Sequence, residues 1–235
     1  MTKFGQRLYL NWLTIVTLIR TYPVRLVRFI FHFFQWLPII RKNHLPSNGF
    51  AVWTLDFGFY IADLFIIPDI IEIAMVWVQP NIRLLNEEEK VYSKKYFKNK
   101  VNLKNVRVNN RISKWVENIA IAFVTFHTIH YSKTISIPIF IHEMVHVWQY
   151  QKFGTVYIFR ALLAQKSKEG YNYGGLESLY SKMLSNYIFT DFNFEQQGEI
   201  FEDYCRMKES QDDQNPIAEA SFEFFVGQVR GSEIT

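Results

Sequence analysis

The chain has 235 residues, of which 49% are hydrophobic and 17% aromatic, and it carries a formal net charge of +4. This composition excludes a disordered chain and predicts one folded domain, or one domain with an appendage. The single cysteine, Cys205, excludes an internal disulfide bond, and we expect it to be a packed thiol.

Residues 1–80 are predicted to form an apolar, basic, helical N-terminal region. Residues 1–50 contain basic side chains but no Asp or Glu. From Leu8 to Leu37, polar residues recur every three or four positions, which predicts a helix with a narrow polar stripe. Pro23 is expected to divide or kink this helix. The longest stretch without charge, Leu8 to Ile19, is too short to span a bilayer.

A second apolar stretch runs from Phe50 to Val78 and contains four acidic residues, namely Asp56, Asp63, Asp69 and Glu72. These acids argue against a simple transmembrane helix and predict pairing with Arg25 or Arg28 across a helical hairpin. Two interpretations stay open. The apolar stretches are either buried helices packed on a core, or residues 1–45 contact an anionic membrane surface.

Targeting signals are weak. Lys3 and Arg7 precede a short apolar run, but no small-x-small cleavage site follows. We therefore expect no cleavable signal peptide and a cytoplasmic or peripheral membrane location. The basic stretch from residue 81 to 114 lacks the pattern that specifies nucleic acid, so nucleic acid is not an expected partner.

The most informative motif is His142-Glu143-Met144-Val145-His146, an HExxH sequence. Two histidines four residues apart on a helix lie on one face, where both imidazoles can reach one metal ion. The run Ile135 to Ile141 before the motif is apolar, which predicts a buried helix. Buried imidazoles need partners, and a metal ion satisfies both. The motif on a helix is the signature of zinc-dependent peptidases, so Zn²⁺ is the expected cofactor.

A catalytic zinc takes three protein ligands, so a third must come from elsewhere in the chain. Candidates are His127, His130 and the acidic residues after Asp191; both histidines are more simply explained as ordinary strand residues. The segment from Phe192 to Ile200 is predicted to be a helix with Asn193 at its N-cap.

On that helix Glu195 and Glu199 share a face. Glu195 is the predicted metal ligand, and Glu199 is predicted to accept the outer N–H of a histidine ligand. Gly198, between them, would let this helix pack closely on the HExxH helix. An alternative register makes Glu199 the ligand and Asp203 its partner. A second alternative is that Glu195, Glu199, Glu202 and Asp203 form a solvated acidic face.

Three segments carry a resemblance to known proteins: FIHEMVHVWQYQ from Phe140 to Gln151, YNY from Tyr171 to Tyr173, and FNFEQQGEIFEDY from Phe192 to Tyr204. They resemble the glutamate-liganded zincins, in which a Glu is followed by an acidic residue four positions later. More narrowly, they are similar to a bacterial family of zincin-like proteins often labelled Vgr-related or Rhs-element-associated. The similarity covers roughly residues 85 to 205. The long gap between His146 and Glu195 departs from the usual zincin pattern.

The resemblance implies an α+β, mainly helical fold. Its zincin-like core would occupy residues 81–235, with a small sheet before the HExxH helix and residues 1–80 as an added apolar region. A short helix opening at Asn86 and two strands, from Val101 to Val108 and from Ala122 to Tyr131, are implied. The second strand is expected to be the edge that holds an extended peptide.

The expected function is zinc-dependent hydrolysis of a peptide bond in a peptide or protein substrate. Zinc would lower the pKa of its bound water, and Glu143 would act as general base. Tyr173 is the predicted oxyanion donor, with Tyr171 as the alternative. Ordinary packing is the competing explanation for both tyrosines, since the chain has 13 Tyr. The competing hypothesis is a non-catalytic zincin-fold binding or structural protein associated with a secretion or toxin system. Neither the substrate nor the oligomeric state follows from the sequence.

Overall fold

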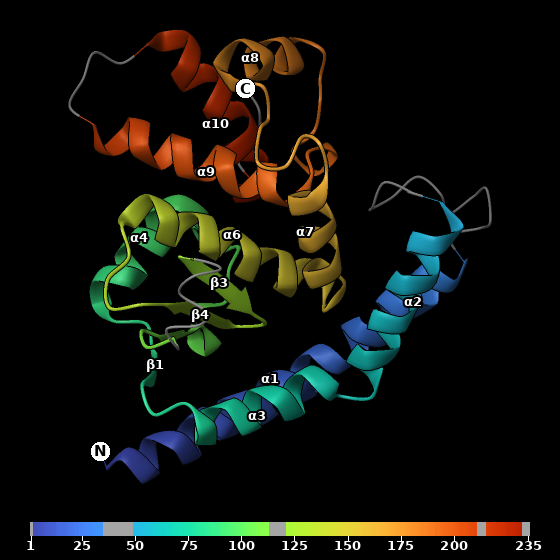
Figure 1. Ribbon diagram of the computed structural model, residues 1–235, viewed down its shortest axis with the longest axis vertical. Coiled ribbons are helices and arrows are strands. Elements are labelled where there is room, and N and C mark those ends of the chain that lie inside the picture. The colour runs from blue at the N-terminus through green and yellow to red at the C-terminus, as the bar shows by residue number, and fades with distance from the viewer. Residues whose placement is uncertain (1, 35–48, 113–120, 211–214, 232–235) are drawn as a thin grey trace.

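The computed structural model describes residues 2–34, 49–112, 121–210 and 215–231. The described chain is mainly helical and contains a small mixed sheet of four strands, so the predicted α+β class is confirmed at this level. Three helices precede the sheet: α3 and the first part of α1 lie at one end of the molecule, and α2 extends along one side toward α7, whereas helices α6 to α10 lie on the other side of the sheet (Figure 1).

The N-terminal helices are long and paired. Helix α1 (Lys3–Phe33) starts at the N-cap Thr2, whose side chain accepts a hydrogen bond from the Gly5 amide. It continues through Pro23 as one helix, so the predicted division there was wrong. The helix changes direction along its length, so that it follows α3 (Ile67–Val78) with its first part and α2 (Phe50–Leu64) with its second (Figure 1). Within the described residues, no helix is both long enough and apolar enough to cross a membrane.

The sheet has the strand order β1-β2-β4-β3. Strands β1 (Ile82–Leu84) and β2 (Arg107–Asn109) are antiparallel, β2 and β4 (Thr128–Tyr131) are parallel, and β4 pairs antiparallel with β3 (Ala122–Thr125). The predicted strand from Ala122 to Tyr131 is therefore a hairpin, because Phe126 turns the chain with a positive φ of 56°. The predicted strand from Val101 to Val108 is wrong over most of its length, since its middle is the 3₁₀ turn η2 (Leu103–Asn105).

Helix α4 (Glu87–Phe97) opens with a complete capping box formed by Asn86 and Glu89. A helix therefore begins at Asn86, where the sequence resemblance implied one. Helix α6 (Ile137–Phe153) carries the HExxH motif and ends at Gly154, where φ is 79°. Helices α7 (Val156–Lys166), α8 (Gly175–Leu184), α9 (Phe194–Glu209) and α10 (Pro216–Arg230) follow, with the turn η3 (Phe189–Asp191) before α9.

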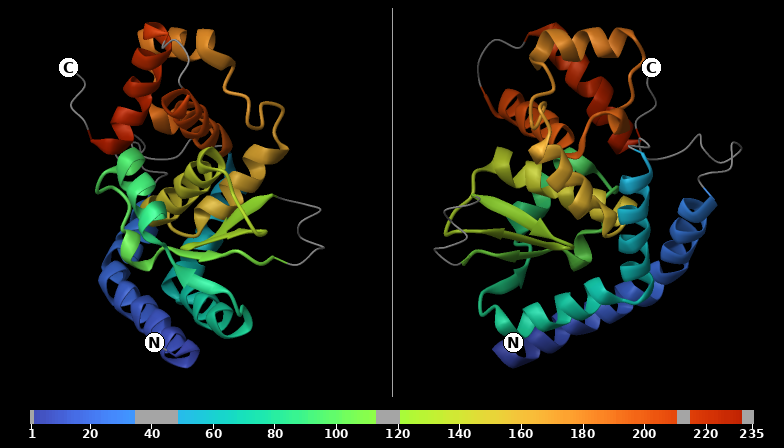
Figure 2. Two further views of the ribbon diagram at one scale, coloured as in Figure 1. Left: turned by 90° about the vertical axis from the view of Figure 1, so that its left-hand side faces the viewer. Right: turned by 45° about the vertical axis from the view of Figure 1, so that its right-hand side comes forward.

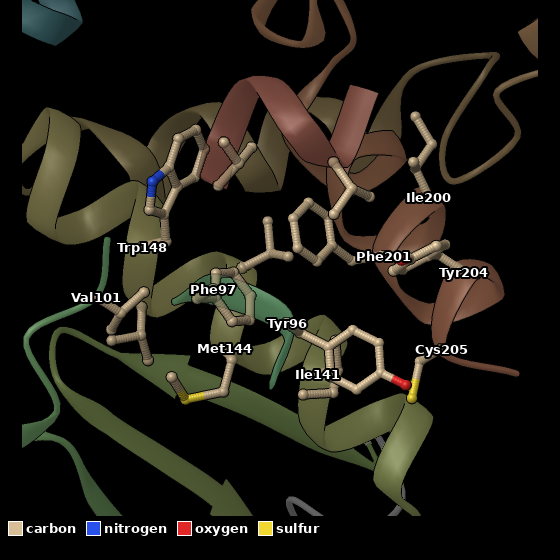
Figure 3. Packing of buried hydrophobic residues seen from close by; sticks show 14 of the residues in the cluster. Tyr96, Phe97, Val101, Ile141, Met144, Trp148, Ile200, Phe201, Tyr204 and Cys205 are labelled. Atoms are coloured by element: carbon tan, nitrogen blue, oxygen red, sulfur yellow. The ribbon is translucent and has the colours of Figure 1, made fainter. Parts of the chain in front are cut away.

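The hydrophobic core lies between α4, α6 and α9 (Figure 3). The rings of Phe97 and Phe201 stack with their centroids 4.9 Å apart, and Met144 and Ile141 of α6 are fully buried beside them. Cys205 is also fully buried and lies near the Tyr96 hydroxyl (Figure 3), which confirms the expectation of a packed thiol. This core fixes α6 against α9, the two helices that carry the candidate site.

The acidic residues of the second apolar stretch have partners, but only one of them pairs as predicted. Arg25 forms a buried ion pair with Asp69 across the α1–α3 contact. Asp56 instead pairs with Arg160 of α7, and Glu72 contacts the ring of His127. The N-terminal helices are thus attached to the rest of the molecule by buried polar contacts.

Candidate metal centre

Helix α6 places His142 and His146 on one face, one turn apart, with their rings in contact at a centroid distance of 5.1 Å. Both histidines and Glu143 are buried, with exposed fractions of 6 to 7%. Every residue from Phe140 to Tyr150 on this helix is buried, as the apolar flanks predict. The two imidazoles are therefore held in a desolvated position, where each ring nitrogen needs a partner.

Helix α9 brings Glu195 to the same point. Asn193 caps this helix as predicted, since its side chain accepts hydrogen bonds from the amides of Glu195 and Gln196. Glu195 Oε2 lies 3.5 Å from His142 Nε2 and 3.5 Å from His146 Nε2. The three side chains are buried and offer ligand atoms that all lie within 4.8 Å of one another.

Gly198 explains how closely the two helices approach. A Cβ atom at this position would lie 2.5 Å from His142 Nε2 and 2.6 Å from its Cε1. The prediction that a small residue here allows close packing is thus confirmed. The His142 ring fills the space that a side chain at position 198 would need.

The outer nitrogens of both histidines face acceptors. His142 Nδ1 lies 3.1 Å from Glu202 Oε2, and His146 Nδ1 lies 2.8 Å from the Gln149 side-chain oxygen. The Gln149 amide donates in turn to Gln197 and to the Phe194 carbonyl. With a cation at Nε2, acceptors near both Nδ1 atoms would favour the tautomer whose lone pair is on Nε2, the nitrogen that faces Glu195.

The second acidic residue in this arrangement is Glu202 rather than the predicted Glu199. Seven residues make almost two full helical turns, so Glu202 lies nearly in line with Glu195, whereas Glu199 is displaced around the helix. The imidazole of His142 spans the distance between these two aligned carboxylates, with one nitrogen directed to each. Glu199 forms a second group with His142 and Glu202, whose ligand atoms also lie within 4.8 Å of one another. The alternative partner Asp203 accepts a hydrogen bond from Tyr173 instead.

The predicted oxyanion donor also lies elsewhere. The Tyr173 hydroxyl donates to Asp203 at 2.7 Å, and this residue does not line the pocket of the site. Tyr171, the alternative, does line the pocket, with its ring centroid 5.9 Å from that of His142. His127 contacts Glu72 and His130 contacts Asn109, so neither histidine joins the cluster.

The charges in the cluster are strongly coupled. Burial alone would lower the pKa of His142, but Glu195 and Glu202 raise it to about 10. Burial opposes the charge of Glu195 as well, yet the two nearby imidazoles lower the pKa of that carboxyl. Desolvation raises the pKa of Glu143, and the two imidazoles offset this only in part. The cluster therefore separates an ionised carboxylate, Glu195, from a more basic one, Glu143.

Two buried carboxylate oxygens in this cluster, Glu143 Oε2 and Glu195 Oε2, have no hydrogen-bond partner among the described residues. The other oxygen of Glu195 accepts a hydrogen bond of 3.0 Å from Gln165. A buried carboxylate oxygen without a donor is costly, and a cation beside it removes that cost. Two imidazole nitrogens and one carboxylate oxygen are a ligand set that suits a divalent transition metal such as zinc. The residues present thus fit a metal ion.

A cavity of about 320 Å³ opens on the cluster. One of its walls is strand β3 and another is helix α7, through Ile158, Ala161 and Leu162. Within the described ranges, β3 has a neighbouring strand on one side only and forms an edge of the sheet. The Tyr157 hydroxyl fixes this edge, because it donates to the Val124 carbonyl and accepts from the Phe126 amide.

Sequence reasoning missed three residues that contact the cluster. Gln149 lies three positions after His146. Helical spacing places both side chains on one face, so the sequence could have indicated that Gln149 lies near the cluster. Glu202 follows Glu195 by seven positions, which is also a helical repeat. Gln165 had no such signal, since only the fold of α7 brings it to Glu195.

Comparison with known proteins adds no identification. No family model matches the chain, and the searches of curated proteins and of solved structures found no significant match.

Proposed function

We propose that this protein is a zinc-dependent peptidase of the glutamate-liganded zincin type. The observation that carries the proposal is the convergence of His142 Nε2, His146 Nε2 and Glu195 Oε2 on one buried point beside Glu143. Three protein ligands with a further position open to water are typical of catalytic rather than structural zinc. The sequence resemblance to zincins supports the same class.

Each residue has a distinct part in this proposal. His142, His146 and Glu195 would hold the zinc ion, which supplies a water of lowered pKa and polarises a carbonyl group. Glu143 would accept a proton from the attacking water at its free Oε2 and return it to the leaving amine. Its raised pKa favours proton uptake by this carboxylate. Tyr171 is the phenol on the pocket wall available to donate to a developing oxyanion.

A peptide is the substrate class that the pocket supports best. Strand β3 supplies a backbone edge along the cavity wall, and an extended peptide can add to such an edge through main-chain hydrogen bonds. Apolar side chains of α7 on another wall would contact a substrate side chain.

The test measures zinc content and peptide hydrolysis separately. We expect the purified protein to carry about one zinc ion per chain, and His146→Ala to lose it. His130→Ala is the matched control, because His130 is also a buried histidine but contacts Asn109 on the sheet. Equal zinc in the wild type and in a folded His146→Ala variant would show that the proposed centre is wrong.

Glu143→Gln separates catalysis from metal binding. We expect this variant to retain zinc and to lose at least about 100-fold in hydrolysis of a peptide library, since general acid–base catalysis typically contributes 10² to 10⁴. Glu88→Gln, an exposed change on α4, is the control. A wild-type protein that binds zinc but cleaves no member of the library would favour the non-catalytic binding protein instead.

A further inference from the structure

One face of α1 is apolar and faces away from the rest of the molecule. Its side chains recur every three or four residues, which aligns them on one side of a helix. They are Phe4, Leu8, Trp12, Ile15, Ile19, Tyr22, Leu26, Ile30 and Phe33, each 40 to 68% exposed. A stripe of this length is far more apolar surface than a water-soluble helix usually presents.

The opposite face of α1 is polar and buried. Four residues of this helix are buried, and three of them are polar: Thr14, Arg25 and His32. Arg107 donates to Thr14 and to the Leu10 carbonyl, and Arg25 binds Asp69. The polar stripe predicted from the sequence therefore faces the protein, and the apolar side faces outward.

Helix α3 repeats this inverted arrangement. Asp69 and Glu72 are buried, and the exposed side chains are apolar: Ile67, Ile70, Ile71, Trp77 and Val78. Trp77 joins the two helices, since its ring lies 5.9 Å from that of Phe4 and the Arg7 guanidinium lies over it at 5.7 Å. The exposed apolar residues of α1 and α3 together are called the apolar face below. The two helices lie side by side at one end of the molecule (Figures 1 and 2).

A hollow lined by lysines adjoins this face. Its volume is about 780 Å³, and it lies between Tyr9 and Leu13 of α1 and the four side chains of Lys90, Lys94, Lys98 and Lys104. On α1 itself, Lys3 and Arg20 are exposed, and no acidic residue occurs between positions 1 and 50. The surroundings of the apolar face are therefore positively charged.

We propose that the apolar face docks on a lipid bilayer that contains anionic lipids. Apolar side chains with Trp and Tyr among them suit the boundary between headgroups and acyl chains. The neighbouring lysines suit the anionic headgroups, to which each basic residue adds binding energy. A second copy of the chain is a poorer partner, because a two-fold contact would bring like charges together. This proposal is independent of the metal centre.

The polar contacts set the orientation. Arg107 holds the first part of α1 through Thr14, and Glu72 holds α3 through the His127 amide and ring. Because both helices are attached along their polar sides, they present only their apolar sides to a partner. Helix α3 and the first part of α1 would lie parallel to the membrane surface, with the sheet and the later helices above it.

The test is flotation of the full-length protein with vesicles, either of phosphatidylcholine alone or with about one-third phosphatidylglycerol. We expect the wild type to float with the anionic vesicles and to bind the neutral vesicles at least about ten-fold more weakly. Trp12→Glu with Ile19→Glu should reduce binding to both at least ten-fold. Lys94→Glu with Lys98→Glu should reduce binding to the anionic vesicles alone.

Matched controls replace exposed apolar residues elsewhere. Leu184 and Ile217 are 64 and 50% exposed on α8 and α10, so Leu184→Glu with Ile217→Glu should bind as the wild type does. Lys166→Glu with Lys168→Glu controls for the loss of positive charge, because both lysines are exposed at the end of α7. Folding of each variant is checked by circular dichroism.

Two outcomes would overturn the proposal. One is a wild type that floats with neither vesicle. The other is a wild type that is a dimer without lipid and becomes a monomer in the Trp12→Glu, Ile19→Glu variant, which would assign the apolar face to a contact between chains.

Discussion

At the scale of single residues, the candidate site depends on the imidazole of His142, which lies between two carboxylates. Glu195 faces its Nε2 at 3.5 Å and Glu202 faces its Nδ1 at 3.1 Å. Without a metal ion this arrangement stabilises the protonated ring. With a metal ion at Nε2, Glu202 would still accept the remaining N–H, so the same two acids serve both states.

Proton release on zinc binding follows from this arrangement. Since the pKa of His142 is raised to about 10, the ring is protonated at pH 7 in the metal-free protein, and zinc must displace that proton. We expect the release of about one to two protons per zinc ion at pH 7, and zinc affinity that rises with pH from 6 to 9. Calorimetry in two buffers of different ionisation enthalpy measures the number. Binding without proton release at pH 7 would contradict a protonated His142.

Glu202 and Glu199 are expected to differ in their effect on the metal. Glu202→Gln keeps the size of the side chain but weakens its ability to accept from His142 Nδ1. We expect it to lower zinc affinity about 10- to 100-fold, as loss of an outer carboxylate typically does. Glu199→Gln, one turn away, should change the affinity less than about three-fold. Competition with a chromogenic chelator measures both, and the reverse order would restore Glu199 to the role predicted from the sequence.

At the scale of elements, the sequence was most informative where one helix carries its own signal. The HExxH spacing and its apolar flanks predict the buried face of α6, and Asn193 predicts the start of α9. Local helical spacing also places Glu195, Glu199 and Glu202 on one side of α9. It does not decide which second acid meets His142, because that depends on how α6 crosses α9.

Contacts between distant segments could not be predicted. The hairpin of β3 and β4 depends on the positive φ at Phe126, a residue type that gives no turn signal. Tyr173 and Tyr171 are two positions apart in an irregular segment, so only the fold decides that Tyr171 reaches the pocket. Gln165 meets Glu195 because α7 packs on α9, and no local pattern encodes that contact.

Close packing of α6 on α9 makes Gly198 a test of the helix pair. In an exposed helix, Gly→Ala stabilises by roughly 1 kcal/mol through helix propensity. Here the added Cβ would lie 2.5 Å from His142 Nε2, the nitrogen directed at the metal. We expect Gly198→Ala to lower zinc affinity at least about ten-fold, as displaced ligands do in other metal sites.

Gly58→Ala is the matched control for that variant. Gly58 also lies inside a helix, α2, but a Cβ there would meet nothing within 4 Å. It should leave zinc affinity unchanged and raise the unfolding midpoint in urea, because the change gains helix propensity worth roughly 1 kcal/mol without a clash. Equal zinc affinity in both glycine variants would mean that the His142 ring does not occupy the position described.

At the scale of the whole molecule, polarity is arranged differently on its two sides. The core between α4, α6 and α9 buries apolar side chains in the ordinary way. Around α1–α3 the buried side chains are largely polar, and the exposed ones are apolar. Packing on a core, the first of the two interpretations of the N-terminal sequence, holds for one face of these helices. The other face is uncovered, and its contact with a membrane stays a proposal.

Lipid should therefore act as a stabilising ligand of the folded chain. Anything that binds only the native state raises its stability by RT ln(1 + [L]/Kd), which is about 2.7 kcal/mol at a concentration 100 times Kd. For a chain of this size that corresponds to a rise in Tm of roughly 5 to 10 °C. We expect anionic vesicles to raise the Tm of the wild type by this amount, measured by circular dichroism at a fixed lipid-to-protein ratio. The Trp12→Glu, Ile19→Glu variant should show a rise below about 2 °C, because its apolar face no longer binds. An equal rise in both proteins would place the stabilising contact outside α1.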